Sequence, residues 1–526
     1  MNKIFRTALS TAAAVMLMTS CSDALNTGSY VDIEDSEVVN SVPQLQKVLV
    51  STYKQLLFNS DGEDRVFAGI PGFAMYPDLS GADITVTQNM GGNQCTSYEY
   101  SNSRTQAQDQ PEKIWFMCYN VINRCNIILT HIDDANGDAA QKKHIKGQAK
   151  AIRSLMYFTL IQNFQQTYII AKEKRGVILR LSENDPHSMP FSTVSQVYDR
   201  IIDDLTDAKT DLDDYSRNNP YEINLDVVNG ILARVYLVMN NWQGAYDAAG
   251  EAFANHSTLM TREQWRDGFD KMIDMGAPEI MWAMEMTDNN NLGGSTQFNF
   301  WYNQDTSYGE GYNDGPIYSF LNFFASQQYV DLFENTDDRY MFWKRTSNVD
   351  PEINTKWAYD KFKHYGDANG AVGGNTRPQI SMMRGSEMLL IKAEAAAHLD
   401  GKTGEALQLL NTLQSARNAS LSDGTNLLED IYIERRKELL GEGVTGMYDL
   451  VRLQKPLIRY MACEANNFAG HYRWGVQYLD GYNASDAEPR GYLDSNDYHF
   501  FCQIPESELL TNAAVSNSDQ NPFKGQ

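Results

Sequence analysis

Apolar residues recur at helical spacing in several long stretches of the chain. In residues 144–161 the apolar positions include Ile145, Ala149 and Ile152, which lie three or four residues apart on one face of a helix. Residues 193–212 follow the same spacing, with polar and charged side chains on the other face. Each stretch therefore predicts one amphipathic helix whose apolar face is buried against the rest of the protein.

Two further stretches predict pairs of antiparallel helices. Residues 225–255 contain two helical patterns separated at Asn240, and residues 386–418 contain two separated at Asp400. Small residues such as Ala245 fall where the paired helices of a tetratricopeptide repeat approach each other closely. Because hairpins of this kind bury their faces against neighbouring hairpins, we expect a mainly α scaffold of tetratricopeptide-like helical hairpins.

The composition changes between these helical stretches. Residues 69–104, 287–316 and 456–500 are rich in Gly, Asn, Asp, Ser and Tyr and have little helical periodicity. Long irregular segments within a helical body tend to be functional or disordered, and the aromatic content of these three argues against disorder. We therefore expect aromatic-rich insertions in the scaffold, with ligand-binding loops near 69–104 and 287–316.

The N-terminus has the pattern of an export signal. Lys3 and Arg6 precede an apolar stretch that is too short to span a membrane, and small residues follow immediately before Cys21. The sequence MTSC, which ends at Cys21, resembles the bacterial lipobox, in which the cysteine is acylated and becomes the first residue of the mature chain. We predict a signal peptide over residues 1–20 and a lipid on Cys21. The alternative is a signal peptide that is cleaved without lipidation.

The acidic composition excludes nucleic acid and anionic lipid headgroups as partners. The chain has 526 residues and a formal charge of −24, and the loss of Lys3 and Arg6 with the signal peptide makes it −24 − 2 = −26. Such a surface repels phosphate groups. No later stretch approaches the roughly 18 consecutive apolar residues of a transmembrane helix. We therefore expect contact with the membrane through the N-terminal lipid alone.

Five of the six cysteines remain after Cys21 is set apart, and an odd number cannot pair completely within the chain. Cys118 and Cys125 are seven residues apart in one predicted helix, so they lie about 10 Å apart along its axis, too far for a disulfide. We expect both to be small buried apolar side chains. The pairing of the others stays open.

Motifs of catalytic sites are absent from the chain. It contains no HExxH, CxxC, GxSxG or EF-hand loop. With 68 Asp and Glu residues, any pair of carboxylates could imitate a glycosidase dyad by chance. We expect a protein that is not an enzyme, and a carboxylate-dependent hydrolase is the minority alternative. No cofactor is predicted, although a structural divalent ion in an Asp- and Asn-rich loop stays open.

The most specific motifs lie in residues 378–526. In chain order they are MMRGSEMLLIKAEAAAHL, ALQLLNTLQSARN, DIYIERRKELLGEG, YDLVRL and QIPESELLTNAAVSNSDQNPF. Their order and spacing resemble the SusD/RagB family of surface nutrient-binding lipoproteins. Upstream, IWFMCYNVINRCNIIL and AKAIRSLMYFTLIQNF also resemble that family, so the resemblance covers nearly the whole mature chain. One departure is visible at Thr445 and Gly446, where members of the family often carry an arginine, and it puts one structural ion pair in doubt.

The resemblance implies a single SusD-like domain over residues 21–526. It also implies an outer-membrane lipoprotein that faces the cell exterior and acts as a lid over a SusC-like TonB-dependent transporter. Members of the family capture oligosaccharide or polysaccharide, or in some cases peptide, and do no chemistry. The expected function is therefore glycan binding and delivery to the transporter, and the alternative is a peptide-binding lid of the same fold.

Several charged and aromatic side chains in these motifs have a simple structural explanation. The charged ones lie in predicted helices, where they form fold-holding salt bridges or a solvated face. They are Glu394, Glu434, Arg435, Arg436 and Glu438. Trp115 and Trp242 fall in helical periodicity, so we expect both in the core.

The candidate ligand-binding residues are aromatic and amide side chains of two irregular stretches. Sugars are held by flat aromatic faces and by polar groups that bond the hydroxyls. The Gly-rich stretch 297–316 supplies Trp301, Tyr302, Asn303, Tyr308 and Tyr312. The second stretch supplies Tyr98 and Tyr100, which an extended strand would place on one face. The alternatives are buried loop anchors for the first set and a β-hairpin packed on the scaffold for the second.

Overall fold

Helices make up most of the chain that the structure, a computed structural model, describes. The described residues are 40–57, 69–86, 95–100, 109–217, 219–266, 269, 276–285, 323–346, 356–359, 361, 379–461 and 490–522. The predicted fold class, mainly α with a helical-hairpin scaffold, is confirmed.

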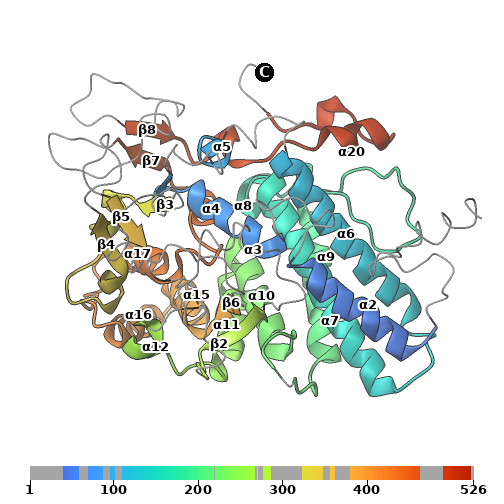
Figure 1. Cartoon of the computed structure of the whole chain (residues 1–526), viewed down its shortest axis with the longest axis horizontal. Helices are drawn as coiled ribbons and strands as arrows, with labels where there is room; N and C mark the ends of the chain where they lie inside the picture. Colours follow the sequence, from blue (N-terminus) through green and yellow to red (C-terminus); the bar gives the residue numbers. More distant parts are fainter. Residues whose placement is uncertain are drawn as a thin grey trace, which may run out of the picture.

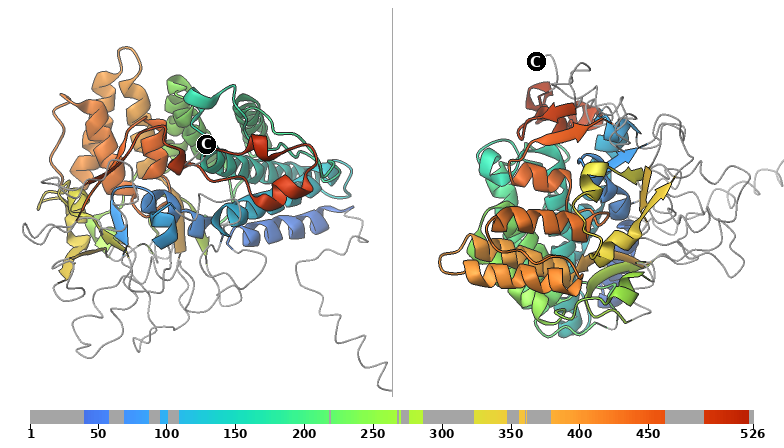
Figure 2. Two further views of the ribbon diagram at one scale, coloured as in Figure 1. Left: turned by 90° about the horizontal axis from the view of Figure 1, so that it is seen from above. Right: turned by 90° about the vertical axis from the view of Figure 1, so that its left-hand side faces the viewer.

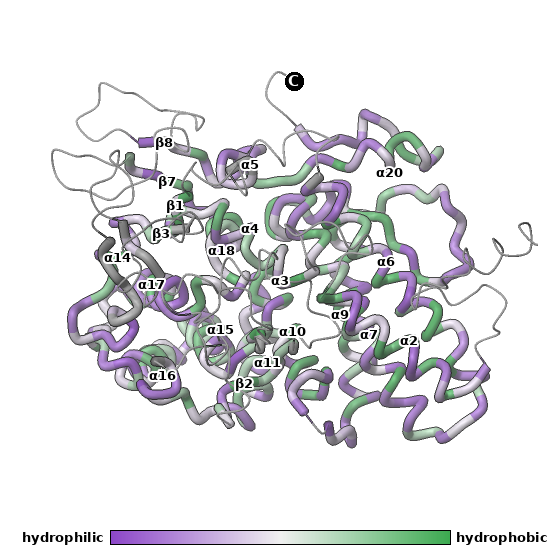
Figure 3. Tube along the Cα trace, viewed as in Figure 1, coloured by the Kyte–Doolittle hydropathy of each residue, from purple (hydrophilic) through white to green (hydrophobic). Residues whose placement is uncertain are grey.

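Four long helices lie side by side in one half of the molecule (Figure 1). They are α2 (Val42–Gln55), α6 (Asp109–His131), α7 (Ala139–Phe164) and α9 (Val194–Asp211). Two of them, α7 and α9, are the amphipathic helices that the apolar spacing predicts. Figure 3 shows apolar and polar positions alternating along this half, as expected for helices that are half buried.

Local capping fixes where α7 and α9 begin. Asp138 accepts a hydrogen bond from the Gln141 N–H at 2.9 Å, so α7 starts several residues before its apolar pattern does. At α9, Thr193 and Gln196 form a reciprocal capping box. These caps satisfy N–H groups that have no partner within the helix.

The two predicted helical hairpins are present and pack on each other. The first consists of α10 (Leu225–Val238) and α11 (Trp242–Ala254), and the second of α15 (Gly385–Ala397) and α16 (Thr403–Ala416). Asn240 turns the first hairpin in a left-handed conformation, with φ of 54°, which asparagine tolerates better than most residues. Buried alanines of α11 allow its close contact with α15.

Shorter helices connect and cover this scaffold. They are α3 (Gly69–Phe73), α4 (Met75–Leu79), α5 (Cys95–Tyr98), α8 (Tyr168–Ala171), α12 (Arg262–Arg266), α14 (Gln327–Val330), α17 (Leu427–Leu439), α18 (Met447–Arg452) and α20 (Glu506–Thr511). Within the described residues, 3₁₀ turns span Asp338–Phe342, Tyr498–Phe500 and Asn517–Asp519.

A small antiparallel sheet lies at one edge of the helical body, where Figure 2 shows the yellow strands gathered, and two strand pairs lie elsewhere. One sheet has the order β1 (Ile84–Val86), β3 (Phe323–Ala325), β5 (Lys356–Tyr359) and β4 (Trp343–Thr346). The other pairs are β2 (Ile280–Glu285) with β6 (Gln379–Arg384), and β7 (Leu457–Tyr460) with β8 (Arg490–Leu493). The strands therefore bring together segments that are distant in the sequence.

The core confirms several expectations for single side chains. Trp115 is buried between helices, and its indole N–H donates to Glu508 Oε2 at 3.1 Å. Cys118 and Cys125 are buried free thiols, and burial raises the pKa of Cys125 to about 12. Cys502 is also buried. The expectation for Trp242 holds only in part, because this ring lies half buried at the surface and stacks on His398 with centroids 3.8 Å apart.

The charged motif residues form buried ion pairs and not a solvated face. Glu438 of α17 is fully buried and accepts hydrogen bonds at 2.8 to 3.1 Å from three guanidinium groups. These belong to Arg339, Arg384 and Arg417. Burial alone would raise the pKa of Glu438, but the charges of Arg417 and Arg384 outweigh it and hold that pKa well below its usual value. The network joins α17 to segments far away in the sequence.

Candidate functional site

The first set of predicted ligand-binding residues lies outside the described part of the chain. This set is Trp301, Tyr302, Asn303, Tyr308 and Tyr312. The predicted lipid attachment site, Cys21, lies outside it too. Their roles therefore stay predictions.

The expected strand that would align Tyr98 and Tyr100 is wrong. Tyr98 ends helix α5, and Tyr100 has a left-handed backbone with φ of 63°. Both side chains are fully buried, and the hydroxyl of Tyr100 donates to the Ser80 carbonyl. In this conformation neither ring offers a face to a ligand. A stretch with a tyrosine at every second position is compatible with a helix end as well as with a strand, and here tertiary contacts decide.

The group that fixes these tyrosines is Arg459 of β7, which the sequence reasoning missed. Its guanidinium lies 4.1 Å from the ring centroid of Tyr98 and 5.4 Å from that of Tyr100. It also donates to the carbonyls of Leu79, Gly81 and Tyr98 at 2.7 to 3.0 Å. Backbone carbonyls leave no signal in the sequence, so this contact could not be predicted. Arg459 thereby joins the region of residues 79–100 to the β7–β8 pair.

The two stretches predicted to bind ligand are attached to neighbouring strands. Val86, at the end of β1, pairs with Phe323, at the start of β3. Residues 87–94 follow the first strand and residues 286–322 precede the second. The chain therefore leaves β1 and enters β3 at the same end of this strand pair.

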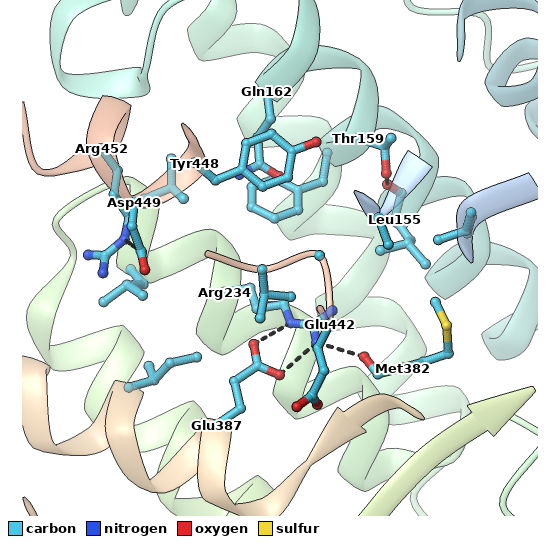
Figure 4. Close-up of a pocket in the computed structure, with 18 of the residues that line it drawn as sticks. Leu155, Thr159, Gln162, Arg234, Met382, Glu387, Glu442, Tyr448, Asp449 and Arg452 are labelled. Carbon is cyan, nitrogen blue, oxygen red and sulfur yellow. Dashed lines mark hydrogen bonds and ion pairs between the residues drawn. The ribbon is translucent and has the colours of Figure 1, made fainter. Parts of the chain in front are cut away.

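A cavity of about 100 Å³ lies in the helical body between α3, α7, α10, α15 and α18 (Figure 4). Apolar side chains form much of its wall, and charged and polar groups project into it. The apolar ones include Leu155, Phe158, Leu237, Trp282 and Ile391. The charged and polar ones are Thr159, Gln162, Arg234, Glu387, Arg435, Glu442, Tyr448, Asp449 and Arg452.

Each carboxylate in this wall is held by a cation. Figure 4 shows Glu387 facing Arg234, which donates to it through Nε at 2.7 Å and Nη2 at 2.6 Å. Glu442 accepts from Arg384 and from Lys361, and their charges hold its pKa below the usual value against the effect of burial. Burial lowers the pKa of Lys361 to about 8.

Asp449 completes this set, because it accepts from Arg452 at 2.6 Å and from Arg435 at 3.3 Å. Burial opposes the ionised form of Asp449, but the charges of Arg435 and Arg452 outweigh it and lower its pKa. Each of the three carboxylates in the wall, Glu387, Glu442 and Asp449, is therefore bonded to at least one cationic side chain.

Among the His, Cys, Asp and Glu side chains of the described ranges, no group of three or more could hold a metal ion. None of the helices within those ranges has the length and apolar character needed to cross a membrane.

The fold and its ion-paired centre define a helical-repeat protein built on tetratricopeptide-like hairpins. Comparison with protein families identifies which one. A model of the SusD-like type, described as "Starch-binding associating with outer membrane", matches residues 65–237, and the model of the SusD family matches residues 297–523. The chain belongs to the SusD/RagB family.

Individual relatives agree with this assignment. SusD-like protein P2 of Formosa agariphila is 24% identical over 387 residues, which are 65% of this chain and 71% of that protein. The crystal structure of a SusD-like carbohydrate-binding protein from Bacteroides vulgatus is 25% identical and matches with a TM-score of 0.75, covering 92% of this chain and 99% of that one. The surface glycan-binding protein A from Bacteroides uniformis shares the fold, with 18% identity, a TM-score of 0.64 and coverage of 91% and 99%.

Proposed function

We propose that this protein is an outer-membrane lipoprotein that binds oligosaccharide or polysaccharide at the cell exterior and delivers it, as a lid, to a SusC-like TonB-dependent transporter. The observation that carries this proposal is the match of SusD family models to both halves of the chain, over residues 65–237 and 297–523. The similar protein from Bacteroides vulgatus, which is a carbohydrate-binding protein, supports the ligand class.

The ligand is held by stacking on aromatic rings of residues 297–316, with Trp301 as the central ring. A sugar offers flat C–H surfaces to such rings and hydroxyls to neighbouring amides such as Asn303. The pairing of Val86 with Phe323 supports this location, because it attaches two irregular stretches of the chain to one strand pair. No chemistry on the ligand is required of this protein.

Retention on affinity gels tests the ligand class. A soluble form that begins at Ser22 should be slowed by at least one polysaccharide in a panel of neutral plant, algal and bacterial glycans. Trp301→Ala should abolish that retention, because loss of one stacking ring removes a central contact. Phe116→Ala is the matched control, because Phe116 is an exposed ring on α6 that is 41% accessible and far in sequence from the stretch. Free passage through every gel would refute glycan binding, and peptides found bound to the purified protein would favour the peptide-binding alternative.

The lipid anchor and the transporter need a separate experiment in the native organism. Cys21→Ala should move the protein from the membrane fraction to the soluble fraction and leave the affinity for glycan unchanged. The wild-type protein, solubilised in mild detergent, should copurify with a large outer-membrane barrel protein. Unchanged fractionation of the variant would contradict the anchor, and purification without any barrel protein would contradict the partner.

A further inference from the structure

A second, smaller cavity lies next to the one in Figure 4. It has a volume of about 20 Å³ and shares four lining residues with the larger cavity of about 100 Å³. The shared residues are Gln162, Val238, Tyr448 and Arg452. On this side, the wall of the larger cavity therefore consists of side chains that also line the smaller cavity. It is not a packed core.

Arg435, in the wall of the larger cavity, has a hydrogen-bond donor without a partner. Its side chain is 2% exposed, and Nη1 is buried with no hydrogen bond. The bonds that its other nitrogens make, to Asp449 and to the Val444 carbonyl, are 3.3 to 3.4 Å long. Charge-assisted bonds are normally about 2.7–2.9 Å long. The guanidinium is thus incompletely bonded by the protein.

Further polar groups without partners lie on the wall that the two cavities share and in the smaller cavity. Gln162, on the shared wall, is half buried, and its side-chain amide makes no hydrogen bond to the described residues. In the smaller cavity, Gln166 Oε1 and Thr167 Oγ1 are buried without partners. Buried polar groups are nearly always bonded, so a set of these at one place calls for a molecule that supplies the bonds. That molecule must both donate and accept.

The charges in the wall favour a neutral molecule. The three guanidinium groups that line the larger cavity, of Arg234, Arg435 and Arg452, are matched by three carboxylates. All three carboxylates already accept from cations, as described above. An anion or a cation would lose its hydration without gaining a net opposite charge. A hydroxyl group would lose far less hydration free energy than an ion, because it is uncharged.

Size and apolar surface define the ligand further. A cavity of about 150 Å³ lined by apolar residues can hold benzene, which has six carbon atoms. The larger cavity here, of about 100 Å³, accordingly has room for a chain of three or four carbons with hydroxyls. Water alone could bond the polar groups but would leave the walls formed by Leu155, Phe158 and Trp282 without C–H contacts.

We propose that this cavity is a binding site for a small neutral polyol, such as a three- or four-carbon sugar alcohol. One hydroxyl accepts a hydrogen bond from Arg435 Nη1, and another bonds the amide of Gln162. The carbon chain lies against Phe158 and Leu237. This site lies within the helical body, on residues outside the stretch 297–316, so it goes beyond the glycan binding proposed above and does not depend on it.

The test combines crystallography with titration in solution. Crystals of the soluble form are soaked separately in erythritol, glycerol and sodium acetate, and the same compounds are titrated by calorimetry. We expect erythritol or glycerol in the cavity, with an oxygen about 3 Å from Arg435 Nη1, and saturable binding in solution. Ordered water only, an adventitious additive seen in the crystal without binding in solution, or preferential binding of acetate would each overturn the proposal.

Two variants separate a ligand site from an accidental cavity. Gln162→Leu removes an amide that bonds none of the described residues, so the fold should be kept while polyol affinity falls about tenfold, as for the loss of one hydrogen bond. Thr412→Val is the matched control, because Thr412 is an exposed residue of α16 that lines neither cavity and its hydroxyl donates to the Gln408 carbonyl at 2.8 Å, and it should change the affinity less than twofold. Equal affinity in Gln162→Leu and wild type would refute the site. Retention of both variants on polysaccharide gels, measured in parallel, reports on the proposed glycan function alone.

Discussion

Asp78 of α4 is a buried carboxylate that lacks a cationic partner, and it makes stability depend on pH. Its side chain is fully buried. Oδ2 accepts from the Gly441 N–H at 2.8 Å and Oδ1 accepts from the Thr445 hydroxyl at 3.0 Å. Among the described residues, these two bonds, both from uncharged donors, are the ones that its carboxylate accepts. Nearby, Lys361 bonds Glu442 and Arg436 bonds Asp83, so neither cation forms an ion pair with Asp78.

Burial raises the pKa of Asp78 from 3.8 to about 7. The negative charge of Asp83 adds to this rise, and the hydrogen bonds from Gly441 and Thr445 and the charge of Lys361 oppose it. Because the folded state holds this proton more tightly, the unfolded chain releases it first as the pH rises. The free energy of unfolding therefore falls between about pH 4 and pH 7 and then levels off. The difference 7 − 3.8 corresponds to a loss of about 4 kcal/mol at most.

Asp78→Asn tests this directly. An asparagine stays neutral at every pH, and it can accept from the Gly441 N–H and donate to the Thr445 hydroxyl. The variant should match the wild type near pH 4 and exceed it by up to about 4 kcal/mol at pH 8. Urea unfolding of the soluble form at pH 4, 5, 6, 7 and 8, followed by circular dichroism, measures the difference.

The control for this series is Asp199→Asn, because Asp199 is an exposed carboxylate on α9. Its effect on the urea midpoint should be small and the same at every pH. A difference between Asp78→Asn and the wild type that does not grow from pH 4 to pH 8 would refute the reasoning. So would a variant that is less stable than the wild type at pH 8, since it would show that the ionised carboxylate is well accommodated.

Three further substitutions test the packing of this region and the buried ion pairs. Gly446→Ala should lower the free energy of unfolding by at least about 2 kcal/mol, because φ is 58° and a Cβ would collide with the Pro77 carbonyl oxygen. Gly404→Ala, where nothing lies within 4 Å of an added Cβ, should be neutral or slightly stabilising by thermal unfolding. Glu438→Gln should cost about 3–5 kcal/mol in urea unfolding, because it removes the buried carboxylate that the guanidinium groups of Arg339, Arg384 and Arg417 share; a loss below 1 kcal/mol would contradict a central role. Arg459→Met should speed hydrogen exchange in residues 79–100 relative to the rest of the chain, because three carbonyls lose their donor. Uniform exchange in that variant would show that Arg459 does not hold the segment.

The helical part of this fold could be predicted because its signal is local. In α7 and α9 the apolar residues repeat at the helical period, and the capping side chains lie next to the helix ends. The hairpin of α10 and α11 likewise shows its turn at Asn240 in the sequence. The position of a helix that buries one face can be predicted without knowing its distant contacts. It follows from the pattern of apolar and polar residues within a short stretch of sequence.

The contacts that fix Tyr98 and Asp78 could not be predicted, because their partners are distant in the sequence. Arg459 bonds the Tyr98 carbonyl across 361 positions, and Thr445 bonds Asp78 across 367. The resemblance marks Thr445 as a departure from the family, but it does not show which group Thr445 contacts. The structure shows that Thr445 bonds Asp78, a buried carboxylate.

The motif that identifies the family cannot by itself determine the ligand. Glu434, Arg435 and Glu438 of the ERRKEL segment are buried in ion pairs that join α17 to distant parts of the chain. A substitution there changes the stability of the scaffold before it changes any contact with a sugar. Two proteins can therefore share the motif and bind different glycans, and residues outside it must set specificity. Exchange of residues 286–322 between two family members, with β2 and β3 kept, should transfer glycan preference, whereas exchange of α17 should not.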